Sequence, residues 1–358
     1  MAAAIARLPP TLTYAAMRPI VTQVELAKRL GVTQMTVSRA LNGTGNLSQA
    51  TRDKVQALAL KLGYRANGMA RRVHEGRYRG MALLGSSTRL GYNIADQEFH
   101  FSVGSTLAQR SWHLTEGWLP GESLADPVEV SGLLDRLLAD AVLVHDVGTH
   151  PPLVEKMLST HRVPAVWVNG GKSADAVDFA DAAAAAAAVE HLLAQGYRRP
   201  ALVLYGVPNT PDTHCSVHER MRGYAEGCAK AGIPARIVHE DAPRSTREGS
   251  VALIRALLEG SDRPDAIVAY AWGVAMTTRV LAGDRGLRIG RDLGLICFAR
   301  EADANLDIPY TVCALDYPAL GRESVAMAWR RLETGRSQKQ VLIPIPIVRP
   351  GASTTRTA

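Results

Sequence analysis

Polar side chains suited to contacting nucleic acid gather on one short segment near the start of the chain. The segment VTQMTVSRALNGTG (32–45) carries Gln34, Met35, Thr36, Ser38, Arg39 and Asn42. An arginine can pair with the edge of a guanine, a glutamine with adenine, and hydroxyl groups can bind phosphate oxygens. Val37, Ala40 and Leu41 recur at helical spacing, which predicts an amphipathic helix with the polar groups outward. An ordinary solvated helix is the alternative at this point.

Patterns for catalysis, cofactor binding and metal binding are weak. GTGNLS (43–48) resembles a dinucleotide loop but ends in serine and follows a predicted helix. GGKS (170–173) lacks the leading glycine of a phosphate loop, because that position is Val166. The four cysteines, Cys215, Cys228, Cys297 and Cys313, show no metal-binding spacing. We therefore predict no enzymatic activity, no cofactor and no metal site, and cysteines that stay reduced in the cytoplasm.

Charge is distributed unevenly along the 358 residues, whose formal net charge is +7. Residues 1–80 hold 13 Lys and Arg against 3 Asp and Glu, and the remainder holds 28 against 31. A basic module on a slightly acidic body indicates a nucleic-acid contact, with a solvated basic tail as the alternative. The chain has no apolar run of about 18 residues and no secretory signal at its start, so we predict a cytoplasmic protein with no membrane partner.

Three short helices are predicted to position the polar segment. The first begins at a capping box, in which Thr22 and Glu25 satisfy free backbone N–H groups, and ends at Gly31. Thr33 is the expected N-cap of the second helix, and Ser48 that of the third. Three helices with a tight turn after the first indicate a helix-turn-helix module, whose second helix enters the major groove.

Residues 21–67 resemble, without a gap, the DNA-binding headpiece of the LacI family of bacterial repressors. The elements TVSR-x-LN, TR-x-KV and LGY-x-x-N carry this resemblance together. It implies that Gln34 and Met35 select the operator bases and that Arg39 contacts a base. It also implies phosphate-contacting or adjacent positions for Thr22, Thr36, Ser38, Asn42 and Thr51. The motif GVT-x-MTVSR is also similar to that of gluconate-type members of the family.

The following stretch, ANGMARRVHEGRYRG (66–80), resembles the hinge of that family, a short helix that enters the minor groove as a pair. The resemblance assigns DNA contacts to Asn67, Ala70, Arg71 and Val73. Relatives carry a leucine at the position of Val73, where it wedges between base pairs, and usually a proline at that of Ala66. Because valine reaches less far, the depth of the DNA kink stays open. A plain basic linker is the alternative.

From residue 80 onward, apolar runs alternate with helical segments. Strands are expected at 81–86, 141–146, 163–169, 200–206, 265–271 and 293–299, and helices at 126–139, 180–195, 216–231, 246–259 and 316–334. This alternation predicts an α/β fold with parallel sheets. The region resembles the regulatory domain of the same family, which has the two-lobed fold of periplasmic sugar-binding proteins. The expected lobes are about 80–169 with 300–316, and 170–299 with the C-terminal strand.

The predicted domain order follows from these segments. It comprises an extension (1–17), the headpiece (18–65), hinge and linker (66–79), the regulatory domain (80–350) and a tail (351–358). The extension is either disordered or lies upstream of a true start at Met17. Paired hinges and a two-fold operator imply a homodimer, and the tail lacks the leucine heptads of a tetramerisation helix.

A ligand site is expected at the carboxyl ends of the strands, between the lobes. Arg220, in ERMRGY, matches the family arginine that binds effector oxygens. Ala271-Trp272 and Ala299-Arg300 stand where many sugar-binding relatives carry Asn-Asp and Asp-Asp, and Ser87 stands where an aspartate is common. The predicted effector-binding residues are Ser87, Arg220, Trp272 and Arg300.

The lost carboxylates and the added Arg300 favour an anionic effector, such as a sugar acid or sugar phosphate, with Trp272 on its apolar face. The alternative is a neutral ligand, with Arg300 paired to Glu301 or Asp303. Altogether we predict an effector-controlled repressor of carbohydrate or sugar-acid genes that binds double-stranded operator DNA. A periplasmic-type solute-binding protein without a role on DNA is the second interpretation.

Overall fold

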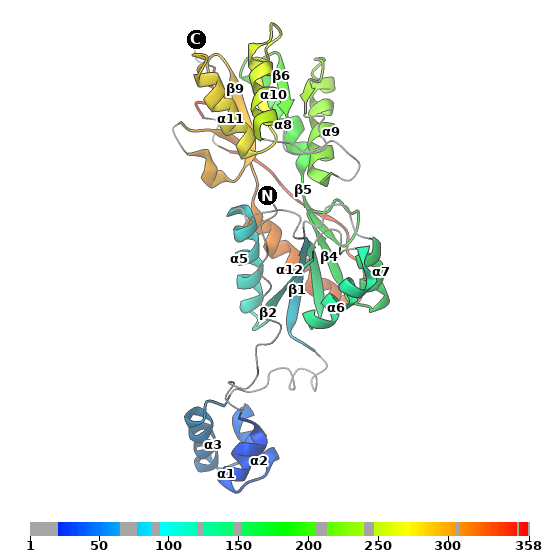
Figure 1. Cartoon of the computed structure of the whole chain (residues 1–358), viewed down its shortest axis with the longest axis vertical. Helices are drawn as coiled ribbons and strands as arrows, with labels where there is room; N and C mark the ends of the chain where they lie inside the picture. Colours follow the sequence, from blue (N-terminus) through cyan, green and yellow to red (C-terminus); the bar gives the residue numbers. More distant parts are fainter. Residues whose placement is uncertain are drawn as a thin grey trace. The chain divides into compact units, whose positions relative to one another are not determined.

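The chain forms two compact units, Met1–Gly76 and Arg77–Ala358 (Figure 1). The computed structural model describes residues 21–64, 77–86, 94–119, 123, 125–145, 152–204, 213–239, 247–305, 308–348 and 351–356. None of the helices in these ranges combines the length and the apolar character that crossing a membrane requires.

Within residues 21–64, the first unit contains three helices, α1 (Gln23–Leu30), α2 (Gln34–Asn42) and α3 (Gln49–Lys61), drawn in blue in Figure 1. The hydroxyl groups of Thr22, Thr33 and Ser48 accept hydrogen bonds from backbone N–H groups three residues later, at 3.2, 3.1 and 3.2 Å. Gly31 and Gly43 end the first two helices with φ of 64° and 71°, a left-handed conformation that favours glycine. The three predicted helices and their N-cap residues Thr22, Thr33 and Ser48 are confirmed.

A small apolar core joins the three helices of this headpiece. Its fully or nearly fully buried side chains are Leu26, Ala27, Val37, Ala40, Val55 and Ala59. One detail differs from the expected capping box: the Glu25 carboxylate accepts a hydrogen bond from Arg29 Nε at 2.7 Å. Arg29 lies one helical turn after Glu25, where an opposite charge attracts the carboxylate away from the helix start.

In the described part of the second unit, the strands form two sheets of six strands each. The first has the order β11-β5-β4-β3-β1-β2, with bounds Val341–Ile343, Ala176–Phe179, Ala165–Val168, Ala141–His145, Gly80–Ser86 and His113–Leu119. The second has the order β12-β10-β9-β8-β6-β7, with bounds Ile347–Val348, Thr311–Ala314, Gly294–Ala299, Ala266–Ala269, Pro200–Val203 and Ile237–Val238. Neighbouring strands are parallel except β10 and β12, and the six predicted strand regions each contain a strand.

Helices cover both faces of each sheet. In the first lobe these are α5 (Ile94–Ala108) with α12 (Tyr317–Thr334), and α6 (Pro127–Leu137) with α7 (Pro152–Thr160). Along β1, Met81 and Leu83 pack with α5, whereas Ala82 and Leu84 pack with α6 and α7. Burial on both faces explains why the strands are continuous apolar runs rather than alternating ones.

In the second lobe, one face is covered by α8 (Asp181–Ala194) and α9 (Cys215–Lys230), and the other by α10 (Arg247–Glu259) and α11 (Trp272–Gly283). The helices α8 and α9 approach closely because α9 carries Gly223 at the contact. A Cβ atom at Gly223 would lie 2.0 Å from the carbonyl oxygen of Ala182. This approach places the middle of α9 beside the start of α8, which matters for Arg220 below.

The expected division into lobes is wrong in two places. Thr311–Ala314, expected in the first lobe, forms β10 of the second sheet, where Thr311 pairs with Ile296. Ala176–Phe179, expected in the second lobe, forms β5 of the first sheet, where Val177 pairs with Val168. In both cases the chain adds a four-residue strand before it crosses between lobes. Each of these two strands carries a buried polar residue, Asp178 in β5 and Thr311 in β10, so neither forms the continuous apolar run that identified other strands of the same length.

The C-terminal boundary also differs from the prediction. Ser353 and Thr354, expected in a tail, are 0% exposed and belong to the second lobe. The Ser353 hydroxyl accepts a hydrogen bond from the Thr311 backbone N–H at 2.8 Å, and Thr354 Oγ1 lies 2.9 Å from His191 Nε2. These small polar side chains satisfy buried partners, so an apolar pattern could not reveal them.

Candidate DNA-binding surface and interlobe site

The predicted reading face of α2 is directed to solvent. Val37 and Ala40 are 0% exposed, whereas Met35 is 61% exposed, and Gln34 and Arg39 are exposed with it. The structure therefore brings together the three residues that the sequence analysis assigned to base recognition.

Arg39 is positioned by the turn that follows α2. A Cβ atom at Gly45, where φ is +73°, would lie 2.8 Å from Arg39 Cδ, so only glycine leaves room for this side chain. Arg52 Nη2 donates to the Gly45 carbonyl oxygen at 2.8 Å and fixes the turn. Within residues 21–64, no side chain or carbonyl group accepts a hydrogen bond from the Arg39 guanidinium, which leaves its five donors for a ligand.

Two of the predicted phosphate-contacting hydroxyl groups, those of Thr36 and Thr51, lie in the first turns of helices. Thr36 Oγ1 lies 2.9 Å from Thr33 Oγ1, and Thr51 Oγ1 lies 2.8 Å from Ser48 Oγ. First turns present unpaired backbone N–H groups and the positive end of the helix dipole, which suits a phosphate. Thr22 and Asn42 are exposed and Ser38 is half-buried, with Asn42 Nδ2 donating to Ser38 Oγ at 3.4 Å.

The hinge assignments lie outside the described residues. This applies to Asn67, Ala70, Arg71 and Val73, and to Ala66.

Arg220, expected at the effector, is buried in an ion pair and is only 5% exposed. Its Nε donates to Asp181 Oδ1 at 2.6 Å, and its Nη1 donates to the Tyr270 carbonyl oxygen at 2.6 Å. The guanidinium carbon also lies 3.9 Å from the centre of the Phe298 ring. Burial lowers the pKa of Arg220, and the Asp181 carboxylate together with Tyr270 and Tyr317 raises it, with a net rise; burial also raises the pKa of the Asp181 carboxyl, which the charge of Arg220 opposes.

Arg300 is also paired with carboxylates. Its Nε and Nη2 donate to the two oxygens of Asp303 at 3.0 and 2.5 Å, and its Nη1 donates to Glu98 Oε1 at 2.8 Å. The hydrogen bonds and charges of Asp303 and Glu98 raise the pKa of Arg300 despite its partial burial. The alternative in which Arg300 pairs with Asp303 is thus confirmed, with Glu98 as an unforeseen second partner.

A cavity of about 650 Å³ lies beside Arg300. Its charged lining residues are Glu98, Arg300, Glu301 and Asp316, and its other walls include Leu315, Ile343, Pro344 and Pro346. Three carboxylates against one guanidinium make this lining net negative. An anion would therefore be disfavoured in this cavity unless the ion pairs around Arg300 were broken.

Of the predicted effector residues that the structure describes, Arg300 lines the cavity of about 650 Å³, and Arg220 and Trp272 do not. Trp272, the first residue of α11, packs edge-to-face on Tyr310 with ring centres 5.4 Å apart, on the face covered by α10 and α11. Arg220 instead packs on Phe298, whose side chain belongs to the opposite face of the same sheet. Trp272 and Arg220 thus pack on opposite faces of the second sheet, because α11 begins at Trp272 and turns this side chain to its own face. Ser87 lies outside the described residues.

Two residues at the carboxyl ends of strands, Asn169 and Tyr270, were not predicted from the sequence as candidate effector contacts. Asn169, after β4, has φ of +52° and a buried Oδ1 with no hydrogen-bond partner. Tyr270 follows β8, and its hydroxyl lies 2.9 Å from Ser216 Oγ at the start of α9. Their position directly after buried strands was the signal that could have identified them. A buried carbonyl oxygen without a partner is unfavourable unless a ligand group donates to it.

The residues described so far do not support a catalytic nucleophile or a metal-binding site. Burial raises the pKa of the Cys215 thiol to about 12, so the thiol is protonated at neutral pH. In the part of the chain that the structure describes, no three His, Cys, Asp or Glu residues are grouped as metal ligands.

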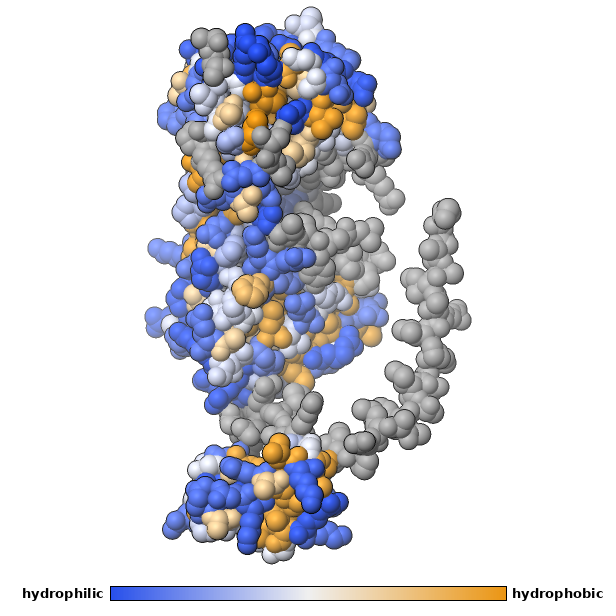
Figure 2. All heavy atoms as spheres, turned by 90° about the vertical axis from the view of Figure 1, so that its left-hand side faces the viewer, coloured by the Kyte–Doolittle hydropathy of each residue, from blue (hydrophilic) through white to orange (hydrophobic). Residues whose placement is uncertain are grey.

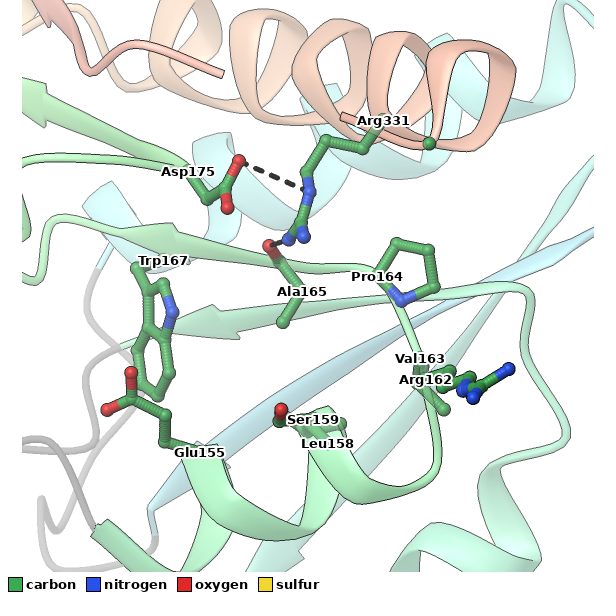
Figure 3. Close-up of a pocket in the computed structure, with 11 residues that line it drawn as sticks. Glu155, Leu158, Ser159, Arg162, Val163, Pro164, Ala165, Trp167, Asp175 and Arg331 are labelled. Atoms are coloured by element: carbon green, nitrogen blue, oxygen red, sulfur yellow. Dashed lines mark hydrogen bonds and ion pairs between the residues drawn. The ribbon is translucent and has the colours of Figure 1, made fainter. Parts of the chain in front are cut away.

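A second cavity, of about 370 Å³, lies at the opposite end of the first sheet (Figure 3). Arg331, from α12, crosses it to donate to the Ala165 carbonyl oxygen and to pair with Asp175 at 3.2 Å. Glu155 and Trp167 face its other side, where Lys172 lies over the indole at 4.5 Å. Because it lies at the amino ends of β4 and β5, this cavity is distinct from the interlobe site.

Comparisons with known proteins agree with this architecture. Residues 24–67 match the family model "Bacterial regulatory proteins, lacI family", and residues 189–354 match "Periplasmic binding protein-like domain". The HTH-type transcriptional regulator AscG of Escherichia coli (strain K12) is 27% identical over 302 residues, covering 82% of this chain and 85% of that protein. The regulator CelR of Thermobifida fusca is 26% identical over 328 residues, covering 88% and 93%.

Solved structures share the fold. The lac repressor dimer bound to operator and the anti-inducer ONPF has a TM-score of 0.79 at 20% identity, covering 94% of this chain and 100% of that one. The complex of the regulator CelR with cellobiose has a TM-score of 0.62 at 22% identity, covering 93% and 99%.

A helix-turn-helix headpiece with an exposed reading helix, joined to a two-lobed α/β domain, defines a DNA-binding regulator of transcription. The chain combines a DNA-binding domain of the LacI family with a periplasmic-binding-protein-like domain, and it is similar over most of its length to transcriptional regulators. The predicted fold class and family are thereby confirmed, and so is the prediction that the protein is not an enzyme, because its relatives are transcriptional regulators. The second interpretation, a solute-binding protein without a role on DNA, is not favoured.

Proposed function

We propose that the protein is a cytoplasmic, effector-controlled repressor that binds double-stranded operator DNA as a homodimer. The observation that carries this proposal is the exposed face of α2 in a folded LacI-family headpiece, with Met35 61% exposed and Arg39 turned to solvent. The LacI family model supports the DNA partner, and the lac repressor dimer on its operator supports the symmetric assembly.

In this proposal Arg39 pairs with a guanine, and Gln34 and Met35 choose the neighbouring bases. Met35 has no hydrogen-bond donor and contributes only apolar contact, for instance with a thymine methyl group. Phosphate contacts come from Thr22, Thr36, Ser38, Asn42 and Thr51. The hinge residues Asn67, Ala70, Arg71 and Val73 enter the minor groove, as the family resemblance implies.

Exposed apolar side chains support the homodimer. Phe101 on α5 is 78% exposed and Val280 on α11 is 61% exposed. Figure 2 faces the side of the regulatory domain on which Figure 1 draws these two helices, and it shows apolar atoms there on both lobes, among hydrophilic ones. Large exposed apolar side chains of this kind commonly mark protein interfaces.

The effector in this proposal is a carbohydrate bound between the lobes. Ser87, Arg220, Trp272 and Arg300 stay candidate contacts, and the buried Oδ1 of Asn169 is added as a hydrogen-bond acceptor for a hydroxyl group. Named relatives include the lactose operon repressor, and the CelR structure contains cellobiose. Both arginines already have carboxylate partners, which favours a neutral sugar over the anionic effector first expected.

Selection of DNA fragments tests the proposal. The native protein is incubated with sheared genomic DNA, the retained fragments are sequenced, and the enriched fragment is used as operator in gel shifts. We expect one enriched, approximately palindromic sequence, and weaker retention in the presence of one member of a panel of neutral sugars. Retention of no specific fragment would contradict DNA recognition, and release by sugar acids alone would contradict the neutral effector.

A further inference from the structure

We propose that Glu98, Arg300 and Asp303 form an ionic clasp that holds the two lobes together beside α5, and that the effector changes operator affinity by acting on this clasp. The second half of this proposal rests on the proposed function above. The first half concerns the regulatory domain alone and stands on the contacts of these three side chains.

The geometry of Arg300 divides its donors between the lobes. Asp303 belongs to η3 (Glu301–Ala304), directly after β9, and binds Nε and Nη2 of Arg300 in a two-pronged contact. This contact orients the planar guanidinium so that Nη1 faces Glu98, on α5 of the first lobe, at 2.8 Å. Asp303 therefore positions Arg300, and Glu98 is the group that closes the gap between the lobes.

Glu98 is held on a rigid support. The neighbouring turn of α5 packs on α12, where Ser102 Oγ donates to the Pro318 carbonyl oxygen at 2.7 Å. A Cβ atom at Gly321 would lie 2.9 Å from Ser102 Cβ and 3.0 Å from the Phe99 carbonyl oxygen, so the two helices are in close contact. Movement of one lobe relative to the other would therefore change the distance between Glu98 and Arg300 directly.

The contact at α9 is of a different kind. There Cys215 Sγ donates to the Asn169 carbonyl oxygen at 3.5 Å, and a Cβ atom at Gly171 would lie 2.7 Å from Cys215 Cβ. Among the ion pairs of the described residues, only that of Glu98 with Arg300 joins the first lobe to the second. The interlobe contact beside α5 is thus charged, whereas the one at α9 is neutral, and a polar ligand can compete for the charged one.

The cavity of about 650 Å³ gives a ligand access to the clasp. Glu98 and Arg300 form part of its wall, together with Leu315 and Asp316 after β10 and with Ile343 and Pro346 around the last crossing between the lobes. A hydroxylated ligand in this cavity would exchange hydrogen bonds with both members of the ion pair. The side chains of Arg300 and Glu98 are 14% and 33% exposed, so the pair is neither fully screened nor fully buried.

The lobe separation can be measured in the full-length protein. Spin labels are attached to unnatural amino acids at Lys156 on α7 and Ala252 on α10, which are exposed, and labelled chains are diluted with unlabelled ones. Double electron–electron resonance then compares the native protein with E98A, R300A and the double variant E98A/R300A. E190A is the matched control, because Glu190 pairs with Lys230 at 2.6 Å entirely within the second lobe.

We expect the ratio of molecules with separated lobes to molecules with closed lobes to rise roughly fivefold in E98A and in R300A. This is the effect expected from the loss of one partly exposed ion pair. The double variant should add little to either single change, and E190A should match the native protein. High salt should separate the native lobes and leave E98A unchanged. Native distances in both single variants, with unchanged circular dichroism, would overturn the clasp.

Operator affinity separates this inference from the proposed function. With the fragment retained by the native protein, E98A and R300A should change affinity several-fold while E190A does not. Separated lobes with unchanged operator affinity would overturn the regulatory half of the inference and leave the clasp in place. Failure of the native protein to retain any fragment would contradict the proposed function, and the distance measurements would still decide on the clasp.

Discussion

Two arginines, one in each unit of the chain, show how the same residue type serves opposite purposes. Arg39 in the headpiece is exposed, and its aliphatic part rests on Gly45. Arg220 in the regulatory domain is 5% exposed and is bound by Asp181 and the Tyr270 carbonyl oxygen. The guanidinium of Arg39 keeps its hydrogen-bond donors available for a ligand. The guanidinium of Arg220 already donates to two partners within the regulatory domain.

This difference determines what each side chain contributes to stability. An exposed arginine with no partner contributes little to the free energy of unfolding, so its removal should affect only the binding of a ligand. A buried arginine compensates a buried carboxylate, and its removal leaves that carboxylate uncompensated. The changes below test this contrast, beginning with the largest expected effect.

Arg220→Ala should lower the free energy of unfolding by about 3–5 kcal/mol, because Asp181 would stay buried without its partner. Thermal unfolding of the regulatory domain by calorimetry measures this. The matched control is Arg222→Ala, two residues along the same helix, where both partners, Glu219 and Glu226, are exposed. Equal losses in the two variants would show that burial of Arg220 does not decide its role.

Thr33→Ala should destabilise the headpiece by about 1 kcal/mol, because the Thr36 backbone N–H loses its cap at the start of α2. Hydrogen exchange of the α2 amides in the full-length protein should become about fivefold faster. Thr44→Ala, at an exposed position after the helix, is the control and should leave exchange unchanged. If exchange also changes in the regulatory domain, the headpiece does not unfold as an independent unit.

A fall in pH should lower the free energy of unfolding of the regulatory domain and leave that of the headpiece unchanged. Burial lowers the pKa of His191 below its ordinary value of 6.5, so the unfolded state takes up a proton more readily. Stability is therefore present above about pH 6.5 and is lost as pH falls below it. Residues 21–64 contain no histidine, so the headpiece has no comparable group.

The melting temperature of the regulatory domain should fall between about pH 7 and pH 5.5, and His191→Gln should make this fall smaller. The difference corresponds to less than about 1 kcal/mol in the free energy of unfolding. His161→Gln, at an exposed position, is the control. An unchanged pH dependence in H191Q would remove His191 as its source.

The headpiece was largely predictable because its signals are local. Thr33 before the helix, Gly43 after it and the apolar spacing of Val37 and Ala40 each lie within a few residues of the feature they specify. The six strand regions were predictable for a similar reason, since burial on both faces produces continuous apolar runs. Family resemblance then supplied the roles of residues such as Arg39.

The interlobe site was much less predictable, because its partners are distant in sequence. Glu98 and Arg300 are 202 residues apart, and nothing near either one indicates the other. The face to which Trp272 turns depends on where α11 begins, and the lobe of Thr311 depends on pairing with β9. Such features follow from tertiary packing, which overrides local preference.

The central claim, that the exposed face of α2 reads DNA, is tested most directly by operator binding of R39A. Fluorescence anisotropy with the fragment retained by the native protein would compare R39A with K61A, a change at the end of α3 outside the reading helix. We predict that R39A loses about 5- to 150-fold in affinity, the effect of removing one arginine–guanine contact, with an unchanged melting temperature. Equal affinity of R39A and K61A for that fragment would contradict the assignment.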